Sequence, residues 1–229
     1  MANRDSERAS DNALARAGGG AVLLAVAIHF VVNSVIKEFP SRSFSGTELQ
    51  AYFTEQFDAW AVVHGARYVA VVAMVLFFAG VFVRTCGHEG DRKGWGIVGL
   101  LGTAILATSL TITNGLETFS YLDLELLREN QELFWLLRDI TRTLFAGEFV
   151  ASALVLLGFS VAGWYSRRIP RWIVYLGYVS AASALLSVIF IVSVLTDGWA
   201  APLANIIAPL TAIVWFVSVG VIMLRHGAE

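Results

Sequence analysis

Charged residues are scarce in this 229-residue chain, at 15% of the total, where a typical soluble domain has about 25%. Hydrophobic residues make up 57%, so the chain has too few polar groups to cover the surface of a soluble globular domain. Disordered and fibrous classes are excluded for the same reason. The composition therefore predicts an integral membrane protein.

Excess basic charge and paired cysteines are also absent. The formal net charge is -2, which argues against a nucleic-acid partner because such proteins need a basic face. Cys86 is the only cysteine, so no disulfide can form within the chain. The partner that the composition predicts is the lipid bilayer.

Six apolar stretches are long enough to cross a bilayer as helices, each of which needs about 20 residues. They are continuous hydrophobic runs rather than the alternating segments of a membrane β-barrel. We predict an all-α fold, a polytopic six-helix transmembrane bundle, with spans at residues 17–37, 59–84, 95–119, 142–164, 171–196 and 201–224. The expected organisation is a cytoplasmic polar tail, the six-span domain and a short cytoplasmic tail, at residues 1–16, 17–224 and 225–229.

Lysine and arginine are distributed unevenly between the two ends of these spans. Ten of the sixteen lie on the side that holds both termini and five lie on the other, with Arg67 left inside a span. Because basic connections are retained in the cytoplasm, we expect a cell-membrane protein with a cytoplasmic N-terminus and C-terminus. The poorer side is the outer side of this expected topology.

Two outer connections have helical periodicity. Residues 45–58 begin with Ser45 and Glu48 at capping-box spacing, and apolar residues then recur at helical intervals. Residues 121–141 show the same recurrence. We predict two outer amphipathic segments, which act either as a packing cap or as a lid over a site.

The strongly polar residues of the first four spans all lie in the outer halves. A charged group deep in a bilayer costs at least ~2.5–3.5 kcal/mol, so such groups usually face a bundle interior and mark function. Helices with polar side chains at one depth can bury them only against one another. We predict a buried polar site in the outer leaflet half, lined by His29, Asn33, His64, Arg67, Asn114, Glu117 and Glu148. If the fourth span begins before residue 142, Arg138 joins the stripe that carries Glu148.

Three functions are compatible with this site. We favour a protein that binds or passes a small polar or amphiphilic molecule, a small-molecule or lipid ligand, with Arg67 on an anionic group. An enzyme-class alternative is a metal- or haem-binding membrane oxidoreductase, with His29 and His64 as ligands of a divalent metal or haem. The third is a structural subunit of a membrane complex, in which Arg67 pairs with an intramembrane glutamate. The chain has no HExxH or GxSxG motif, so no catalytic residue is assigned.

Residues 144–186 read LFAGEFVASALVLLGFSVAGWYSRRIPRWIVYLGYVSAASALL. They combine a Gly-containing span that ends near LLG, a basic turn with Pro and Arg, and a second span rich in Leu and Gly. This pattern resembles an uncharacterised bacterial family of six-helix integral membrane proteins, of the domain-of-unknown-function type. The resemblance implies a six-helix membrane protein and carries no assigned activity.

Overall fold

The computed structural model describes residues 2–35, 40, 42–86, 93–195, 199 and 202–227. Within these ranges the chain is helical and contains no strand, which confirms the predicted all-α fold. The helices are α1 (Ala2–Val35), α2 (Gly46–Glu55), α3 (Phe57–Cys86), α4 (Lys93–Leu122), α5 (Leu124–Glu129), α6 (Gln131–Ser166), α7 (Arg171–Ile189), α8 (Ile191–Leu195), a π-helical turn η1 (Leu203–Ile207) and α9 (Ala208–His226).

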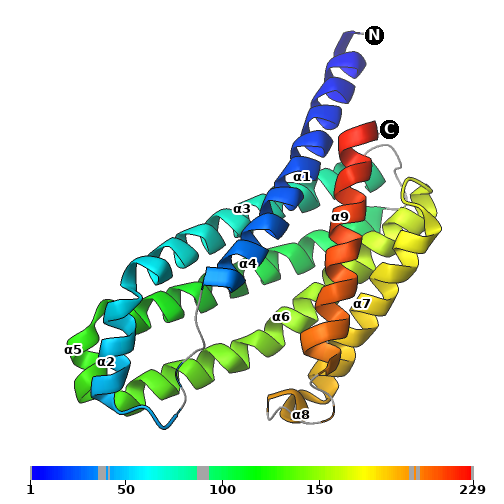
Figure 1. Cartoon of the computed structure of the whole chain (residues 1–229). Coiled ribbons are helices and arrows are strands. Elements are labelled where there is room, and N and C mark those ends of the chain that lie inside the picture. The colour runs from blue at the N-terminus through cyan, green and yellow to red at the C-terminus, as the bar shows by residue number, and fades with distance from the viewer. Residues whose placement is uncertain are drawn as a thin grey trace.

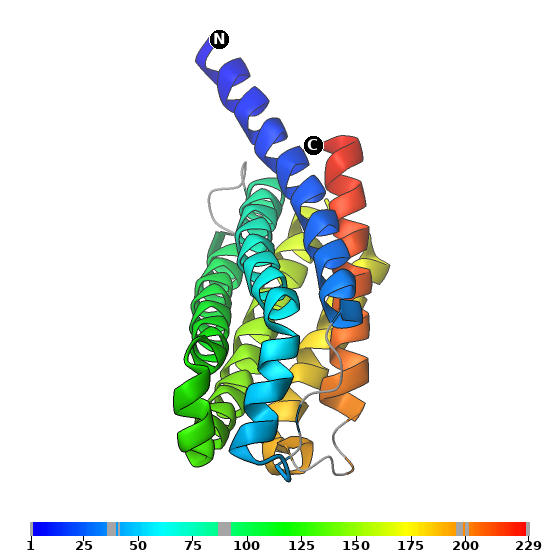
Figure 2. The same cartoon turned by 60° about the vertical axis from the view of Figure 1, so that its left-hand side comes forward.

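Six helices are long and apolar enough to cross a membrane, as the hydropathy pattern predicts. They are α1, α3, α4, α6, α7 and α9 with the end of η1, and they make the chain a multi-pass membrane protein. Each long helix packs on the next around a closed ring in the order α1, α3, α4, α6, α7, α9 and back to α1. Figure 2 shows these helices running side by side along the length of the molecule.

The two ends of the ring differ. Both chain termini lie at one end, where the first turns of α1 project beyond α9, and α2, α5 and α8 lie at the other (Figure 1). We call these the termini end and the cap end. The termini end is the side for which the sequence predicts a cytoplasmic location, and the cap end is the predicted outer side.

Helix boundaries depart from the predicted spans where polar residues continue a helix beyond its apolar part. α1 begins at Ala2, so most of the predicted polar tail is helical. α6 begins at Gln131 instead of near residue 142, because no proline or glycine interrupts residues 131–146. The predicted fifth span is divided, since α7 ends at Ile189 and the short α8 follows. Hydropathy marks the apolar part of a helix but not its full length.

The core nearer the termini end is aromatic at its centre. Phe77, Phe78, Phe159 and Trp215 are all 0% exposed. The rings of Phe78 and Phe159 stack with their centroids 5.5 Å apart, and Trp215 meets Phe77 edge-on at 6.1 Å. Lipid tails are as apolar as these side chains, so close packing rather than a hydrophobic driving force holds the helices together here.

Glycines permit the closest helix contacts. A Cβ placed on Gly158 of α6 would lie 2.8 Å from the Cα of Gly99 on α4. A Cβ on Gly177 of α7 would lie 2.9 Å from Nε1 of Trp215 and would overlap Oγ of Ser160. These two polar atoms are buried and have no hydrogen-bond partner within the described part of the chain. Small residues thus set the spacing of α4, α6, α7 and α9.

A second, smaller aromatic core closes the cap end. Leu49 and Phe53 of α2 pack with Trp60 of α3 and Phe134 of α6, and the rings of Phe53 and Phe134 are 5.6 Å apart. The predicted capping box is present, since Ser45 and Glu48 exchange hydrogen bonds at the start of α2. This packing supports the interpretation of the first amphipathic segment as a cap.

The second predicted amphipathic segment has a different form. Only residues 124–129 make a separate helix, α5, whereas residues 131–141 are the first turns of α6. Asp123 caps α5 through a hydrogen bond from the backbone of Leu126. Most of the apolar periodicity of residues 121–141 therefore belongs to the first turns of α6, and only a short part belongs to a separate helix.

Candidate functional site

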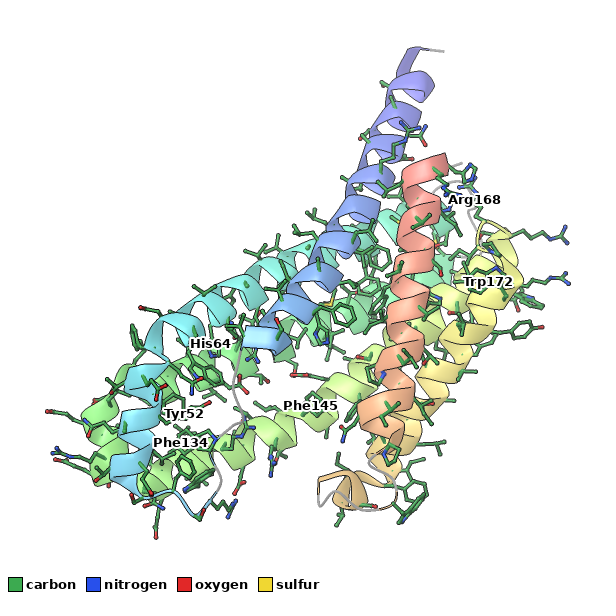
Figure 3. The ribbon with its side chains drawn as sticks, in the orientation of Figure 1. Tyr52, His64, Phe134, Phe145, Arg168 and Trp172 are labelled. Atoms are coloured by element: carbon green, nitrogen blue, oxygen red, sulfur yellow. The ribbon has the colours of Figure 1, made fainter. Side chains whose placement is uncertain are left out.

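Polar side chains from three neighbouring helices meet in the half of the bundle nearer the cap end. α3 supplies His64 and Arg67, and α4 supplies Asn114 and Glu117, in each case three residues apart on one helical face. α6 completes the group with Arg138 and Glu148, together with Thr113 of α4. We call these seven residues the ionic cluster. Figure 3 shows His64 on α3, between the aromatic cap marked by Tyr52 and Phe134 and the middle of the bundle.

Two hydrogen bonds join the buried residues His64 and Asn114. Nδ1 of His64 lies 2.5 Å from Oδ1 of Asn114, and Nδ2 of Asn114 donates to the backbone carbonyl of His64 over 3.2 Å. Because an amide oxygen only accepts, Nδ1 carries a proton and donates it. The imidazole also stacks on Trp60, with centroids 5.5 Å apart. These contacts fix the orientation of the ring.

Glu117 joins two guanidinium groups on different helices. Oε2 of Glu117 accepts a hydrogen bond from Nη1 of Arg67 on α3. Its other oxygen, Oε1, lies 3.5 Å from Nη1 of Arg138 on α6. The side chains of Arg67, Arg138 and Glu117 are 35%, 25% and 19% exposed, so this part of the cluster is only partly shielded.

Glu148 lies deeper in the same group of helices. It is 7% exposed, and its Oε1 accepts a hydrogen bond from Oγ1 of Thr113 over 3.1 Å. Glu148 interacts electrostatically with Glu117 and Arg67, and His64 interacts with the same two residues. The ionisable groups of α3, α4 and α6 therefore form one coupled set.

The structure brings together five of the seven residues predicted to line the site: His64, Arg67, Asn114, Glu117 and Glu148. The prediction did not include two partners that the structure adds. Arg138 lay outside the predicted fourth span, although its stripe with Glu148 was visible for an earlier helix start. Thr113 carried no signal, because membrane helices contain many isolated hydroxyl residues.

The first span does not behave as predicted. His29 is exposed, with its ring edge-on to Phe30 of the same helix at 5.9 Å. The burial expected for His29 is therefore wrong, and the main packing partners of α1 are α3 and α9. The side chain of Asn33 lies outside the described part of the structure.

The arrangement gives no support to a metal centre. Within residues 2–35, 42–86, 93–195 and 202–227, no group of three or more His, Cys, Asp or Glu side chains could hold a metal ion. His29 is exposed on α1, whereas His64 is buried against Asn114 of α4. A divalent metal or haem shared by these histidines is not what the geometry favours.

No protein-family model, curated protein or solved structure matches this chain. The family resemblance of residues 144–186 stays a prediction. What the fold and the site define is a class: a six-helix membrane protein with an ionic cluster between three of its helices. Its function has to be inferred from the chemistry of that cluster.

Proposed function

We propose that this membrane protein binds a small amphiphile with an anionic headgroup, a carboxylate or a phosphate, at the ionic cluster. The observation that carries the proposal is the convergence of Arg67 and Arg138, from two helices, on the single carboxylate of Glu117. Guanidinium groups bind carboxylate and phosphate through paired hydrogen bonds. Glu117 thus occupies the position that the anionic group of a ligand would take.

In the binding step, the anionic headgroup of the ligand would replace the carboxylate of Glu117. The 3.5 Å separation of Arg138 and Glu117 is longer than a normal hydrogen bond of about 2.7–3.2 Å. An incoming anion can therefore bind Arg138 first and then displace Glu117 from Arg67, so that it contacts both guanidinium groups. The partial exposure of all three side chains provides access from the surrounding bilayer.

An exposed aromatic side chain on the same face of α6 as Arg138 favours an amphiphile over a fully polar anion. Phe145 lies seven residues, or two helical turns, along α6 from Arg138 and is 43% exposed. A hydrocarbon tail can lie against this ring while its headgroup reaches the guanidinium. Such a molecule would enter from the bilayer rather than from the aqueous phase.

The membrane and the orientation are part of the same proposal. The excess of lysine and arginine at the termini end favours a cell membrane with both termini in the cytoplasm. The ionic cluster would then lie in the outer leaflet half. Binding or passage of the amphiphile would begin from that leaflet.

A thermal-shift titration in the neutral detergent dodecyl maltoside tests the proposal. Dodecyl phosphate or dodecanoate should raise the melting temperature, because a ligand that binds only the folded state stabilises it. Arg138→Gln should weaken the apparent affinity by about tenfold or more, since it removes hydrogen bonds between charged groups. Arg128→Gln, an exposed arginine on α5, is the matched control and should bind as the wild type does.

Glu117→Gln separates ligand binding from a purely structural ion pair. If Glu117 competes with the ligand, the variant should bind dodecyl phosphate more tightly while its melting temperature without ligand falls. A structural subunit in which Glu117 only joins helices predicts the fall alone. Equal shifts with dodecyl phosphate in the wild type, Arg138→Gln and Glu117→Gln would refute the proposed function.

A further inference from the structure

The turn between α6 and α7 concentrates positive charge at the termini end. Arg167, Arg168 and Arg171 lie within five residues, and the sequence has no Asp or Glu from residue 149 to residue 196. Arg167 ends α6 with φ 57°, in the left-handed region, which reverses the chain. Ile169 anchors the turn and is 3% exposed. The arginines are therefore held on a fixed piece of backbone.

Arg84 of α3 adds a buried positive charge beneath this turn. It is 4% exposed and donates to the backbone carbonyl of Arg168 from Nε over 3.4 Å and from Nη2 over 3.2 Å. Its Nη1 donates to the carbonyl of Gly227. Arg168 donates in return to the carbonyl of Arg84 over 2.8 Å. These acceptors are neutral, so they satisfy the donors of Arg84 without cancelling its charge.

Aromatic side chains surround the turn in the manner typical of residues at the level of lipid headgroups. Trp164 and Trp172 are 38% and 56% exposed at the adjoining ends of α6 and α7, and Figure 3 shows Arg168 and Trp172 at this end of the molecule. The guanidinium of Arg171 lies 5.2 Å from the ring centroid of Trp164, and Tyr175 meets Trp164 edge-on. Exposed Trp and Tyr rings are typical of the membrane–water interface.

We propose that this turn is a binding site for the headgroup phosphate of an anionic phospholipid in the leaflet at the termini end. Arg167, Arg168 and Arg171 would contact the phosphate, and Arg84 would strengthen the positive potential from below. Trp164 and Tyr175 would lie beside the glycerol and upper acyl chains. The site is on the opposite end of the bundle from the ionic cluster, so it does not depend on the proposed function.

Native mass spectrometry with equimolar palmitoyl-oleoyl phosphatidylglycerol and phosphatidylcholine, which share their acyl chains, tests this site. The wild type should retain phosphatidylglycerol preferentially. In the double variant Arg167→Asn/Arg171→Gln, the ratio of retained phosphatidylglycerol to phosphatidylcholine should fall about fivefold for each positive charge removed. Asn tolerates the left-handed conformation at position 167, and Arg171→Gln alone provides a second variant, with a loss of about fivefold, if the double variant folds poorly.

The matched control removes the same charge from the same end but outside the turn. Arg16→Gln/Arg225→Gln changes two exposed arginines on α1 and α9 and should keep the preference. Unchanged preference in the Arg167/Arg171 double variant would overturn the proposal, and so would an equal loss in the control, which would show diffuse surface attraction. Displacement of phosphatidylglycerol by millimolar inorganic phosphate would instead assign the arginines to a soluble anion and overturn the lipid site.

Discussion

The two ends of the bundle use arginine in different ways. Toward the cap end, Arg67 and Arg138 meet the carboxylate of Glu117, and Arg42 bonds Asp139 through both carboxylate oxygens. At the termini end, Arg84 donates to backbone carbonyls. At the cap end, arginine side chains therefore pair with carboxylate side chains. At the termini end, the side chain of Arg84 bonds to backbone carbonyls.

This difference has consequences for function and for stability. A carboxylate on a side chain can be replaced by the anion of a ligand, so the cap end can exchange partners. A backbone carbonyl cannot leave, so the bonds of Arg84 hold the end of α3, the turn after α6 and the end of α9 together. We expect variants at the termini end to affect folding most and variants at the cap end to affect ligand binding most.

The largest effect on stability should come from Arg84→Gln. The change shortens the side chain and leaves the part-buried carbonyl of Arg168 and the buried carbonyl of Gly227 without these donors. Loss of charged hydrogen bonds and the stranded acceptors should together cost about 3 kcal/mol. Thermal unfolding in detergent measures the change, and Arg225→Gln, exposed at the same end, should leave the melting temperature unaltered. A wild-type melting temperature in Arg84→Gln would contradict the anchoring role.

Gly177→Ala should have the next largest effect. Its new Cβ would overlap Oγ of Ser160 and press on the indole of Trp215, and overpacking of this kind costs about 1–3 kcal/mol. Ser160→Ala removes the overlapping oxygen, so the double variant should regain part of the lost stability. Additive losses in a double-mutant cycle measured by thermal unfolding would show that Ser160 is not the obstacle.

The role of Arg84 is not visible in the sequence, although the membrane spans and part of the ionic cluster are. The sequence predicted six spans and their order because hydropathy is a property of the residues alone. It also placed Arg67 and Glu117 in one site, since buried charges in a membrane need partners. Arg84 was counted only as a basic residue flanking a span, and nothing local indicates that its acceptors are carbonyls of α9 and of a distant turn.

Errors at the cap end have a similar origin. The start of α6 at Gln131 was missed because its first turns are amphipathic, and this pattern predicted a separate surface segment and not the beginning of a membrane helix. Arg138 was therefore left out of the predicted site residues, although it is the second guanidinium on Glu117. His29 was included because depth was inferred from sequence position, whereas the ring order that separates α1 from α4 and α6 is a property of the tertiary structure.

Breaking the pair of Arg42 and Asp139 should have a much smaller effect than breaking the anchor of Arg84. The two side chains are 66% and 49% exposed, and exposed ion pairs contribute about 0.2–1 kcal/mol. Arg42→Gln should lower the melting temperature slightly, and the difference from the wild type should shrink at high salt because ions screen the pair. A large loss independent of salt would instead assign Arg42 to packing against Trp135, whose ring lies 6.0 Å away.

The smallest expected effect is a pH dependence at the start of α2. The backbone N–H of Ser45, and then its hydroxyl, lower the pKa of Glu48 below 4.5. A carboxylate with a lowered pKa stabilises the folded state at pH values above its unfolded pKa, and this contribution is lost as the pH falls through the folded value. An NMR titration of Glu48 should give a midpoint below 4.5 that rises in Ser45→Ala. An unchanged midpoint in that variant would show that the capping box does not form.

Contact between a bound anion and the two guanidinium groups tests the central claim most directly. Solid-state NMR can measure dipolar coupling between the phosphorus of dodecyl phosphate and the 13C-labelled Cζ atoms of arginine in bilayers of phosphatidylcholine. We predict a coupling in the wild type that weakens in Arg67→Lys and in Arg138→Lys and is lost when both are changed. A coupling that persists in the double variant, or none in the wild type, would contradict ligand binding at Glu117.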